Sequence, residues 1–348
     1  MIPRLSVIAI LVALPLIGCQ RGGAVKPTPR PTPLAVNNDD RFNSDEAQFN
    51  DWSFLGIPGK QIRTRHWDIR TTMTSDRLRQ LLPGFYEKAL DRYQNAFGVD
   101  LPPPPYSLET YLFADRRQWK NKTRMLLPDK AASFEGLGRG GFTTDGIAVL
   151  YDIDGYGWHR DTLALGAHEG WHQYVQTTFK DQLPAWLDEG VATTMEGFSW
   201  RRRGLTFRTD ANRERWSRLR QCVYEDRLMP LDVLISAHPE RFLDGRKQTL
   251  LDYYAQVWAL TRYLAEAEDG RYRDQVGNAL LLAASGDLYR QLLRSEQLSD
   301  EARARIEDES DAGLALLEFL VGPDIDGFQD RFHDWSRSLV GAATSRES

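Results

Sequence analysis

The stretch Thr162–Tyr174, which reads TLALGAHEGWHQY, and the stretch Leu183–Glu196, which reads LPAWLDEGVATTME, carry the strongest signal in this chain. In the first stretch His168 and His172 are four residues apart, and residues with that spacing project from the same face of a helix. Two imidazoles placed in this way can bind one metal ion at about 2.0–2.1 Å each. Glu169 follows the first histidine, where a carboxylate can act as general base toward metal-bound water.

A third ligand is expected from the second stretch. Glu189 lies seventeen residues after His172, on a second predicted helix that begins near Pro184. A connection over residues 177–183 would let this helix fold back, so that Glu189 comes to lie over the two histidines. Two neutral imidazoles and one carboxylate leave a divalent ion with residual positive charge and an open position for water.

These two stretches resemble the gluzincin metallopeptidases. That class carries His-Glu-x-x-His and then, on the next helix, Trp-Leu-x-Glu-Gly and a further Glu. Residues 186–190 and Glu196 match the second element in residue type and register. The resemblance covers about residues 141–264 and implies a zincin-like fold and peptidase activity. It implies one Zn²⁺ held by His168, His172 and Glu189, with Glu169 as the catalytic base.

The resemblance also implies residues around the metal. A downstream tyrosine would donate its hydroxyl to the oxyanion, and Tyr254 fits that role best, with Tyr253 as the alternative. Independently of the resemblance, a ligating histidine normally donates its other N–H to a carboxylate or carbonyl. Glu196, two helical turns after Glu189 on much the same face, is the first candidate, and Thr193, one turn after Glu189, is the next. An edge strand would pair with extended substrate. That strand is expected over Ile147, Ala148, Val149, Leu150 and Tyr151.

The substrate stays open at this point. Gluzincin aminopeptidases carry a Gly-x-Met-Glu-Asn segment, which residues 141–146 (GFTTDG) do not match, so aminopeptidase activity is not expected. Asp145, before Gly146, is interpreted as a turn residue. The alternatives of peptide and peptidoglycan cross-link both stand. So does a non-catalytic envelope lipoprotein that uses a peptidase-like fold for binding or structure, although an intact Glu169 favours the enzyme.

The amino terminus predicts a lipid anchor. Residues 1–18 contain Arg4 and an apolar run over 5–17, which spans about 20 Å as a helix and is shorter than a roughly 30 Å hydrocarbon core. This is typical of a signal peptide. Leu16-Ile17-Gly18-Cys19 resembles the lipobox of bacterial lipoproteins. The resemblance implies cleavage before Cys19, its acylation, and a place in the bacterial cell envelope, in the outer membrane facing the periplasm if the cell is Gram-negative.

Three further regions are expected after the signal peptide. Residues 19–50 include alternating prolines, which favour an extended tether and cannot build a core. Residues 51–200 are predicted to form an α+β core with the metal helices, and residues 201–348 a mainly helical part that contributes Tyr254. Strands are expected over 61–69, 106–113 and 147–151, and an amphipathic helix over 76–97.

Composition excludes several other classes of protein. The 348 residues are 41% hydrophobic and 27% charged, which is close to the globular average and argues against a disordered chain. A formal charge of −5 argues against a nucleic-acid partner. Gly138-Arg139-Gly140 lacks the Lys-Ser/Thr of a phosphate loop, so no nucleotide is expected. The expected partners are therefore a peptide or protein substrate and, through the lipid anchor, a membrane.

Overall fold

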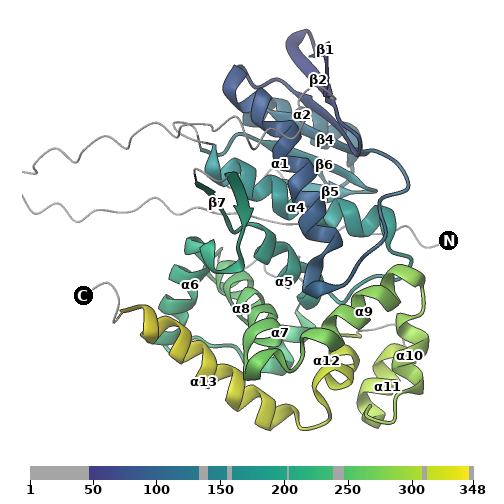
Figure 1. Cartoon of the computed structure of the whole chain (residues 1–348), viewed down its shortest axis with the longest axis vertical. Helices are drawn as coiled ribbons and strands as arrows, with labels where there is room; N and C mark the ends of the chain where they lie inside the picture. Colours follow the sequence, from purple (N-terminus) through teal and green to yellow (C-terminus); the bar gives the residue numbers. More distant parts are fainter. Residues whose placement is uncertain are drawn as a thin grey trace, which may run out of the picture.

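The computed structural model describes residues 47–132, 140–154, 159–201, 204–237, 247–307 and 312–344. The predicted signal peptide, Cys19 and nearly all of the predicted tether lie outside these residues. Strands and their covering helices occupy the upper part of Figure 1, and the helices of the second half of the chain occupy the lower part. The chain is thus a mixed α/β protein, in agreement with the expected α+β class. No helix among the described residues combines the length and apolar character needed to cross a membrane.

A six-stranded sheet forms the first part. Its strands follow one another in space as β1-β2-β3-β4-β6-β5. The β3–β4 and β4–β6 pairs are parallel, and the other pairs are antiparallel. The strands are β1 (Gln48–Phe54), β2 (Ile57–Arg63), β3 (Trp67–Thr71), β4 (Leu108–Phe113), β5 (Phe142–Thr144) and β6 (Ile147–Tyr151).

The strand predicted over residues 61–69 is two strands in the structure. The chain turns between β2 and β3, where the Thr64 N–H donates to the Trp67 carbonyl over 2.9 Å. Glu87 fixes this turn, because one of its carboxylate oxygens accepts the Thr64 hydroxyl at 2.6 Å and the His66 backbone N–H at 3.0 Å. A contact so distant in sequence could not be seen in the local residue pattern.

The prediction that β6 is the edge strand was wrong. Residues 147–151 pair with β4 on one side, and residues 147–149 pair with β5 on the other, so β5 ends the sheet. Asp145 and Gly146 join the two strands with φ values of 48° and 75°. Two successive residues with positive φ close a tight hairpin. This turn folds residues 142–144 back onto β6, and it confirms Asp145 as a turn residue.

Three helices pack around the sheet. They are α1 (Asp76–Gln94), α2 (Arg116–Leu126) and α4 (Arg160–Thr178). The predicted amphipathic helix is confirmed, and Ser75 caps α1 by accepting the Leu78 N–H at 3.3 Å. Helix α1 contacts α4, where the Tyr93 hydroxyl donates to the Ala167 carbonyl over 2.6 Å. These contacts hold the residues around His168 against both the sheet and α1.

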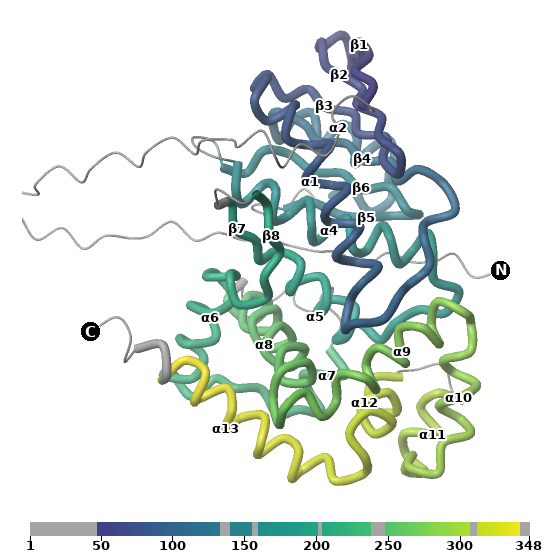
Figure 2. Tube along the Cα trace, viewed as in Figure 1, coloured from purple at the N-terminus to yellow at the C-terminus, as the bar shows by residue number. Residues whose placement is uncertain are grey.

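The second part is mostly helical, as the tube in Figure 2 also shows. A short antiparallel pair, β7 (Phe198–Arg201) and β8 (Gly204–Phe207), interrupts the helical pattern. The helices are α5 (Ala185–Met195), α6 (Arg213–Tyr224), α7 (Leu231–Ser236), α8 (Lys247–Glu266), α9 (Arg273–Ser285), α10 (Leu288–Arg294), α11 (Asp300–Glu307), α12 (Gly313–Val321) and α13 (Ile325–Thr344).

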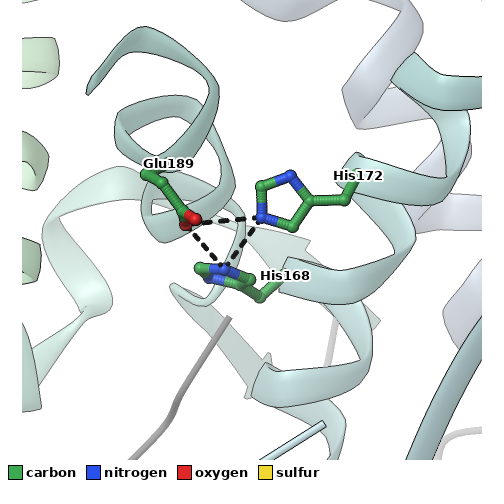
Figure 3. Close-up of side chains that lie close together, drawn as sticks. All are labelled: His168, His172 and Glu189. Atoms are coloured by element: carbon green, nitrogen blue, oxygen red, sulfur yellow. Dashed lines mark hydrogen bonds and ion pairs between the residues drawn. The ribbon is translucent and has the colours of Figure 1, made fainter. Parts of the chain in front are cut away.

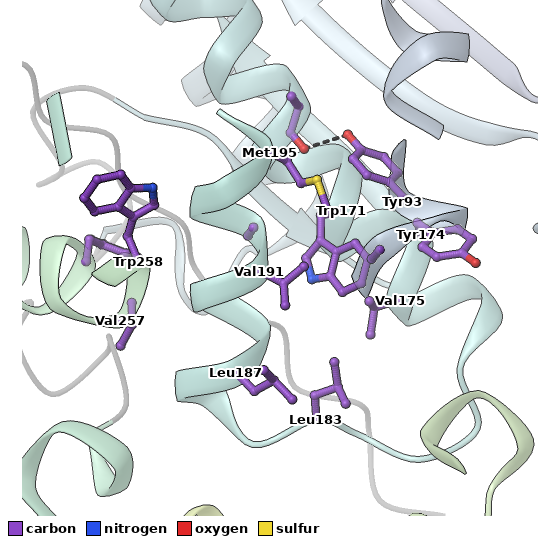
Figure 4. Close-up of a cluster of buried hydrophobic side chains, with 14 of the residues drawn as sticks. Tyr93, Trp171, Tyr174, Val175, Leu183, Leu187, Val191, Met195, Val257 and Trp258 are labelled. Carbon is purple, nitrogen blue, oxygen red and sulfur yellow. Dashed lines mark hydrogen bonds between the residues drawn. The ribbon is translucent and has the colours of Figure 1, made fainter. Parts of the chain in front are cut away.

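Helix α5 lies at the centre of the molecule and contacts α4 and α8. Every residue from Trp186 to Met195 is buried. Figure 4 shows Leu187, Val191 and Met195 of α5 in the same apolar cluster as Trp171 of α4. The crossing with α8 is close, because a Cβ atom at Gly190 would lie 2.0 Å from Thr261 Oγ1. Glu189 is therefore carried on an element that is packed on all sides.

Candidate metal centre

Three predicted ligands meet between α4 and α5. His168 Nε2 lies 3.2 Å from His172 Nε2, and Glu189 Oε2 lies 3.3 Å and 3.4 Å from these two nitrogens (Figure 3). The two histidines project from the same face of α4, as the spacing predicted. The three side chains expose at most 1% of their surface. The triangle is thus closed to bulk water.

The distances fit a metal ion. Ligand atoms at about 2.0–2.1 Å from a tetrahedral zinc ion are about 3.3–3.4 Å apart, close to the three separations seen here. Each Nδ1 faces a carboxylate, Glu196 for His168 at 2.8 Å and Asp188 for His172 at 3.1 Å. If Nδ1 of each neutral ring carries the proton, both Nε2 lone pairs point at Glu189. Such a convergence of acceptors is unfavourable unless a proton or a metal ion lies among them.

Glu196 is part of a buried ionic network. Arg215 donates to its carboxylate through Nε at 3.0 Å and Nη2 at 2.8 Å, and Asn212 donates to it at 2.6 Å. Burial by itself raises the pKa of Glu196, but Arg215 and His168 outweigh that effect and hold this pKa at about 2. Glu196 therefore stays ionised and orients the His168 ring, which is the role that the sequence predicted for it.

Asp188 orients the ring of His172. The Trp171 indole N–H donates to Asp188 Oδ1 at 2.8 Å, while Oδ2 faces His172 Nδ1. Burial lowers the pKa of His172, but Asp188 and Glu189 more than reverse this and hold it well above the ordinary value in the absence of a cation. Metal binding at this site must therefore displace protons.

The prediction that Thr193 supports a histidine was wrong. Its hydroxyl donates to the Gly190 carbonyl at 2.7 Å, one turn back in the same helix. This is a common use of a threonine side chain within a helix. Asp188 fills the position instead, and it could have been suspected because it adjoins Glu189. Arg215 lies in the first turn of α6 and Asn212 caps the start of that helix, and no spacing in the sequence pointed to them.

Glu169 is fully buried beside the triangle. Its Oε2 accepts the Thr143 hydroxyl of β5 at 2.8 Å, and its Oε1 has no hydrogen-bond partner among the described residues. Burial raises the pKa of Glu169 to about 7, although both histidines and Thr143 oppose the shift. A carboxyl group that titrates near neutrality can both take up and return a proton.

Tyr254 is the tyrosine next to the metal ligands. Its ring centroid lies 6.1 Å from that of His168, and the Arg215 guanidinium lies 5.0 Å from the centre of the Tyr254 ring. The Tyr253 hydroxyl points elsewhere and donates to the Ala237 carbonyl at 3.3 Å. The geometry therefore favours Tyr254 over Tyr253, and its role toward an oxyanion stays a prediction.

A second group of potential ligands lies at the start of α4. Oxygen or nitrogen atoms of Asp152, Asp154 and His159 lie within 4.8 Å of one another. Asp152 Oδ1 already accepts the Thr162 hydroxyl at 2.7 Å and faces His159 Nδ1 at 3.2 Å. Asp154 accepts the Asp161 backbone N–H at 3.2 Å. These bonds tie the end of β6 to the start of α4 and account for the group as a structural feature.

No protein-family model, curated protein or solved structure matches this chain.

Proposed function

We propose that this protein is a zinc-dependent peptidase. The observation that carries the proposal is the triangle of His168 Nε2, His172 Nε2 and Glu189 Oε2, with sides of 3.2–3.4 Å and the carboxyl of Glu169 beside it. Two imidazoles and one carboxylate are the protein ligands of a known type of catalytic zinc site, which keeps a further position for water or substrate.

The residues around the triangle have separable roles in this proposal. Bound zinc would polarise the scissile carbonyl and lower the pKa of a bound water toward about 7. Glu169 would accept the proton of that water and pass it to the leaving amine. Thr143 holds one oxygen of Glu169 at 2.8 Å and leaves the other for the proton. The Tyr254 hydroxyl would stabilise the oxyanion.

Strand β5 is the better candidate for the edge that pairs with extended substrate. It ends the sheet, and its central residue Thr143 contacts Glu169. A peptide added alongside a terminal strand gains backbone hydrogen bonds, and its scissile bond would lie near the catalytic base. The substrate class proposed is therefore an extended peptide, either free or within a protein.

Burial of the centre favours a second candidate function. His168, Glu169, His172, Glu189 and Tyr254 each expose at most 1% of their surface. A peptide can reach the metal only if part of the chain moves aside. A non-catalytic envelope protein, in which zinc only ties α4 to α5, would need no such opening.

Metal content and peptide hydrolysis separate these two functions. Wild type should contain about one zinc ion per chain and cleave peptides in a broad library. Glu169→Gln should keep the zinc and lose the cleavage, whereas Glu296→Gln, at an exposed position, should keep both. Zinc without cleavage in wild type would support the structural role, and wild type purified without zinc would contradict both proposals.

We further propose a lipid anchor at Cys19, which lies outside the described residues. Cells fed labelled palmitate should incorporate label into wild type and not into Cys19→Ala. Equal labelling of the two proteins would contradict the anchor without affecting the metal centre.

A further inference from the structure

A cavity of about 300 Å³ lies where the end of α1, the end of α5 and the second half of α8 meet. Its walls include Arg92, Thr194, Arg262, Glu266 and Arg273, and none of the residues assigned above to the metal centre lines it. Its volume is at the lower end of the range for small-molecule sites. The cavity is therefore distinct from the metal centre and large enough for a small organic molecule or ion.

Three guanidinium groups from three elements line this cavity, against one carboxylate. Arg262 is neutralised by that carboxylate, because it donates to the two oxygens of Glu266 at 2.9 Å and 2.5 Å. Arg273 donates to the carbonyl of Ala265 at 2.9 Å and 2.7 Å. A carbonyl oxygen is a neutral acceptor, so the charge of Arg273 is not cancelled. The lining thus carries an excess of positive charge.

Arg92 gives the strongest indication of a bound anion among the three arginines. No carboxylate within the described part of the chain forms an ion pair with it, and its buried Nε has no hydrogen-bond acceptor there. Burial lowers the pKa of Arg92, which means that its surroundings disfavour the positive charge. Arg92 is half-buried, so its guanidinium has lost part of its hydration without gaining a charged partner among the described residues. An acceptor with negative charge would satisfy this group.

We propose that the cavity binds a small multivalent oxyanion, a di- or tricarboxylate or a phosphate, through Arg92 and Arg273. Guanidinium groups bind carboxylate and phosphate oxygens in pairs, and two uncompensated cations match an anion of more than one charge. Arg262 belongs to the wall, where its ion pair with Glu266 and its position 5.0 Å from the Trp258 ring hold it in place. The proposed anion site does not require the metal centre to be catalytic.

The cavity and the metal centre share structural supports. Thr194 and Met195 line the cavity and directly precede Glu196, which orients His168. Thr209 also lines it and lies in the short 3₁₀ helix Thr209–Ala211, just before Asn212, which donates to Glu196. An anion bound in the cavity would therefore stiffen two segments that hold the metal centre.

Calorimetric titration of the full chain with citrate, and separately with inorganic phosphate, tests the proposal. At least one of the two should bind saturably, and the affinity should fall as sodium chloride is raised. Arg92→Gln and Arg273→Gln should each weaken binding by about tenfold or more, since each removes a charge-assisted hydrogen bond. Comparing the citrate titration with the phosphate titration shows which kind of oxyanion the cavity prefers. Acetate should bind more weakly than either.

Arg117→Gln is the matched control, because Arg117 lies on α2, is 92% exposed in its side chain and does not line the cavity. It carries the same change in charge and should bind as wild type does. Circular dichroism on every variant shows whether it is folded, and Arg273→Gln gives the answer if Arg92→Gln unfolds. The proposal is overturned if neither citrate nor phosphate binds wild type saturably, or if folded Arg273→Gln binds as tightly as wild type.

Discussion

Glu169 is fully buried, although an exposed carboxyl group is ionised at neutral pH. Its pKa of about 7 lies above the ordinary value of 4.5, so the folded metal-free protein binds a proton there more tightly than the unfolded chain does. Ionisation of Glu169 therefore destabilises the fold above about pH 7, and this penalty vanishes below about pH 4.5. The same burial that would suit Glu169 to its proposed role as a base reduces stability.

Glu169→Gln should stabilise the chelator-treated protein at pH 8. The substitution replaces a carboxyl group that is unfavourable to ionise with a neutral amide. For a pKa shift of this size, the free energy of unfolding should rise by up to about 3 kcal/mol. Urea unfolding at pH 8 and at pH 4.5 measures the effect, which should shrink at the lower pH. Glu296→Gln, at an exposed position, is the control and should change the free energy of unfolding little. A Glu169→Gln variant less stable than wild type at pH 8 would contradict the assignment.

The pKa of Glu196 is shifted in the opposite direction, and its effect on stability is opposite as well. Its pKa of about 2 lies below the ordinary 4.5, so its ionised form stabilises the fold fully above about pH 4.5. That contribution is lost as the pH falls toward 2. The carboxylate of Glu196 compensates the charge of Arg215, which is 1% exposed.

Glu196→Gln should destabilise the protein by about 3–5 kcal/mol at pH 7, because it leaves Arg215 buried without its partner. The difference in unfolding free energy from wild type should decrease as the pH falls from 4.5 toward 2. Adding Arg215→Met to the variant should recover part of the loss, since no unpaired charge then remains. A loss that is constant across this pH range would contradict the role given to the ion pair.

Helix α5 carries or directly precedes three acidic residues of the candidate metal centre. It carries Glu189 and Asp188, and Glu196 follows directly after it. Its close crossing with α8 occurs at Gly190, the residue next to the ligand Glu189. A Cβ atom there would meet Thr261 Oγ1 at 2.0 Å and the Val257 carbonyl oxygen at 3.0 Å. The position of Glu189 is therefore set by backbone approach between two helices.

Gly190→Ala should destabilise the fold by about 1–3 kcal/mol through overpacking, although alanine favours a helix. Gly190→Ala combined with Thr261→Ala should recover much of this, because the nearest obstructing atom is removed. Gly341→Ala in α13 is the control, since nothing lies within 4 Å of a Cβ atom there, and it should stabilise slightly. The melting temperatures of wild type and the three variants test this prediction. A Gly190→Ala variant that melts at the same temperature as wild type would show that α5 and α8 can move apart with no loss of stability.

At the level of the whole molecule, the candidate metal centre joins the two parts of the chain. Helix α4 packs on the sheet through contacts with β6, β5 and β4, whereas α5 packs against α8 of the helical part. Arg215 of α6 reaches the centre through Glu196, and Tyr254 of α8 lies beside His168. A bound ion would therefore stabilise the contact between the two parts as well as the site itself.

Removal of zinc should lower the melting temperature of wild type. A ligand at a thousand times its dissociation constant adds about 4 kcal/mol, and each kcal/mol shifts the melting temperature by about 2–4 °C in a protein of moderate size. Chelator followed by added zinc should lower and then restore the value in wild type. His172→Ala should respond to neither treatment. Equal melting temperatures for wild type with and without zinc would contradict a metal at this position.

Residues that one helix places together could be predicted from the sequence alone. The four-residue spacing puts His168 and His172 on one face of α4, and α1, β4 and β6 follow from patterns of apolar residues within a single segment. The three predicted ligand residues do meet, and Glu196 was predicted to support a histidine because it lies two turns from Glu189.

The groups from distant segments that complete the candidate centre became visible only in the folded chain. It replaced Thr193 by Asp188, brought Arg215 and Asn212 to Glu196, made β5 rather than β6 the edge of the sheet, and gathered Arg92 and Arg273 around one cavity. Each of these depends on the packing of α5 and α8 or on the pairing of strands. Such contacts are long-range, and a local pattern of residues carries no information about them.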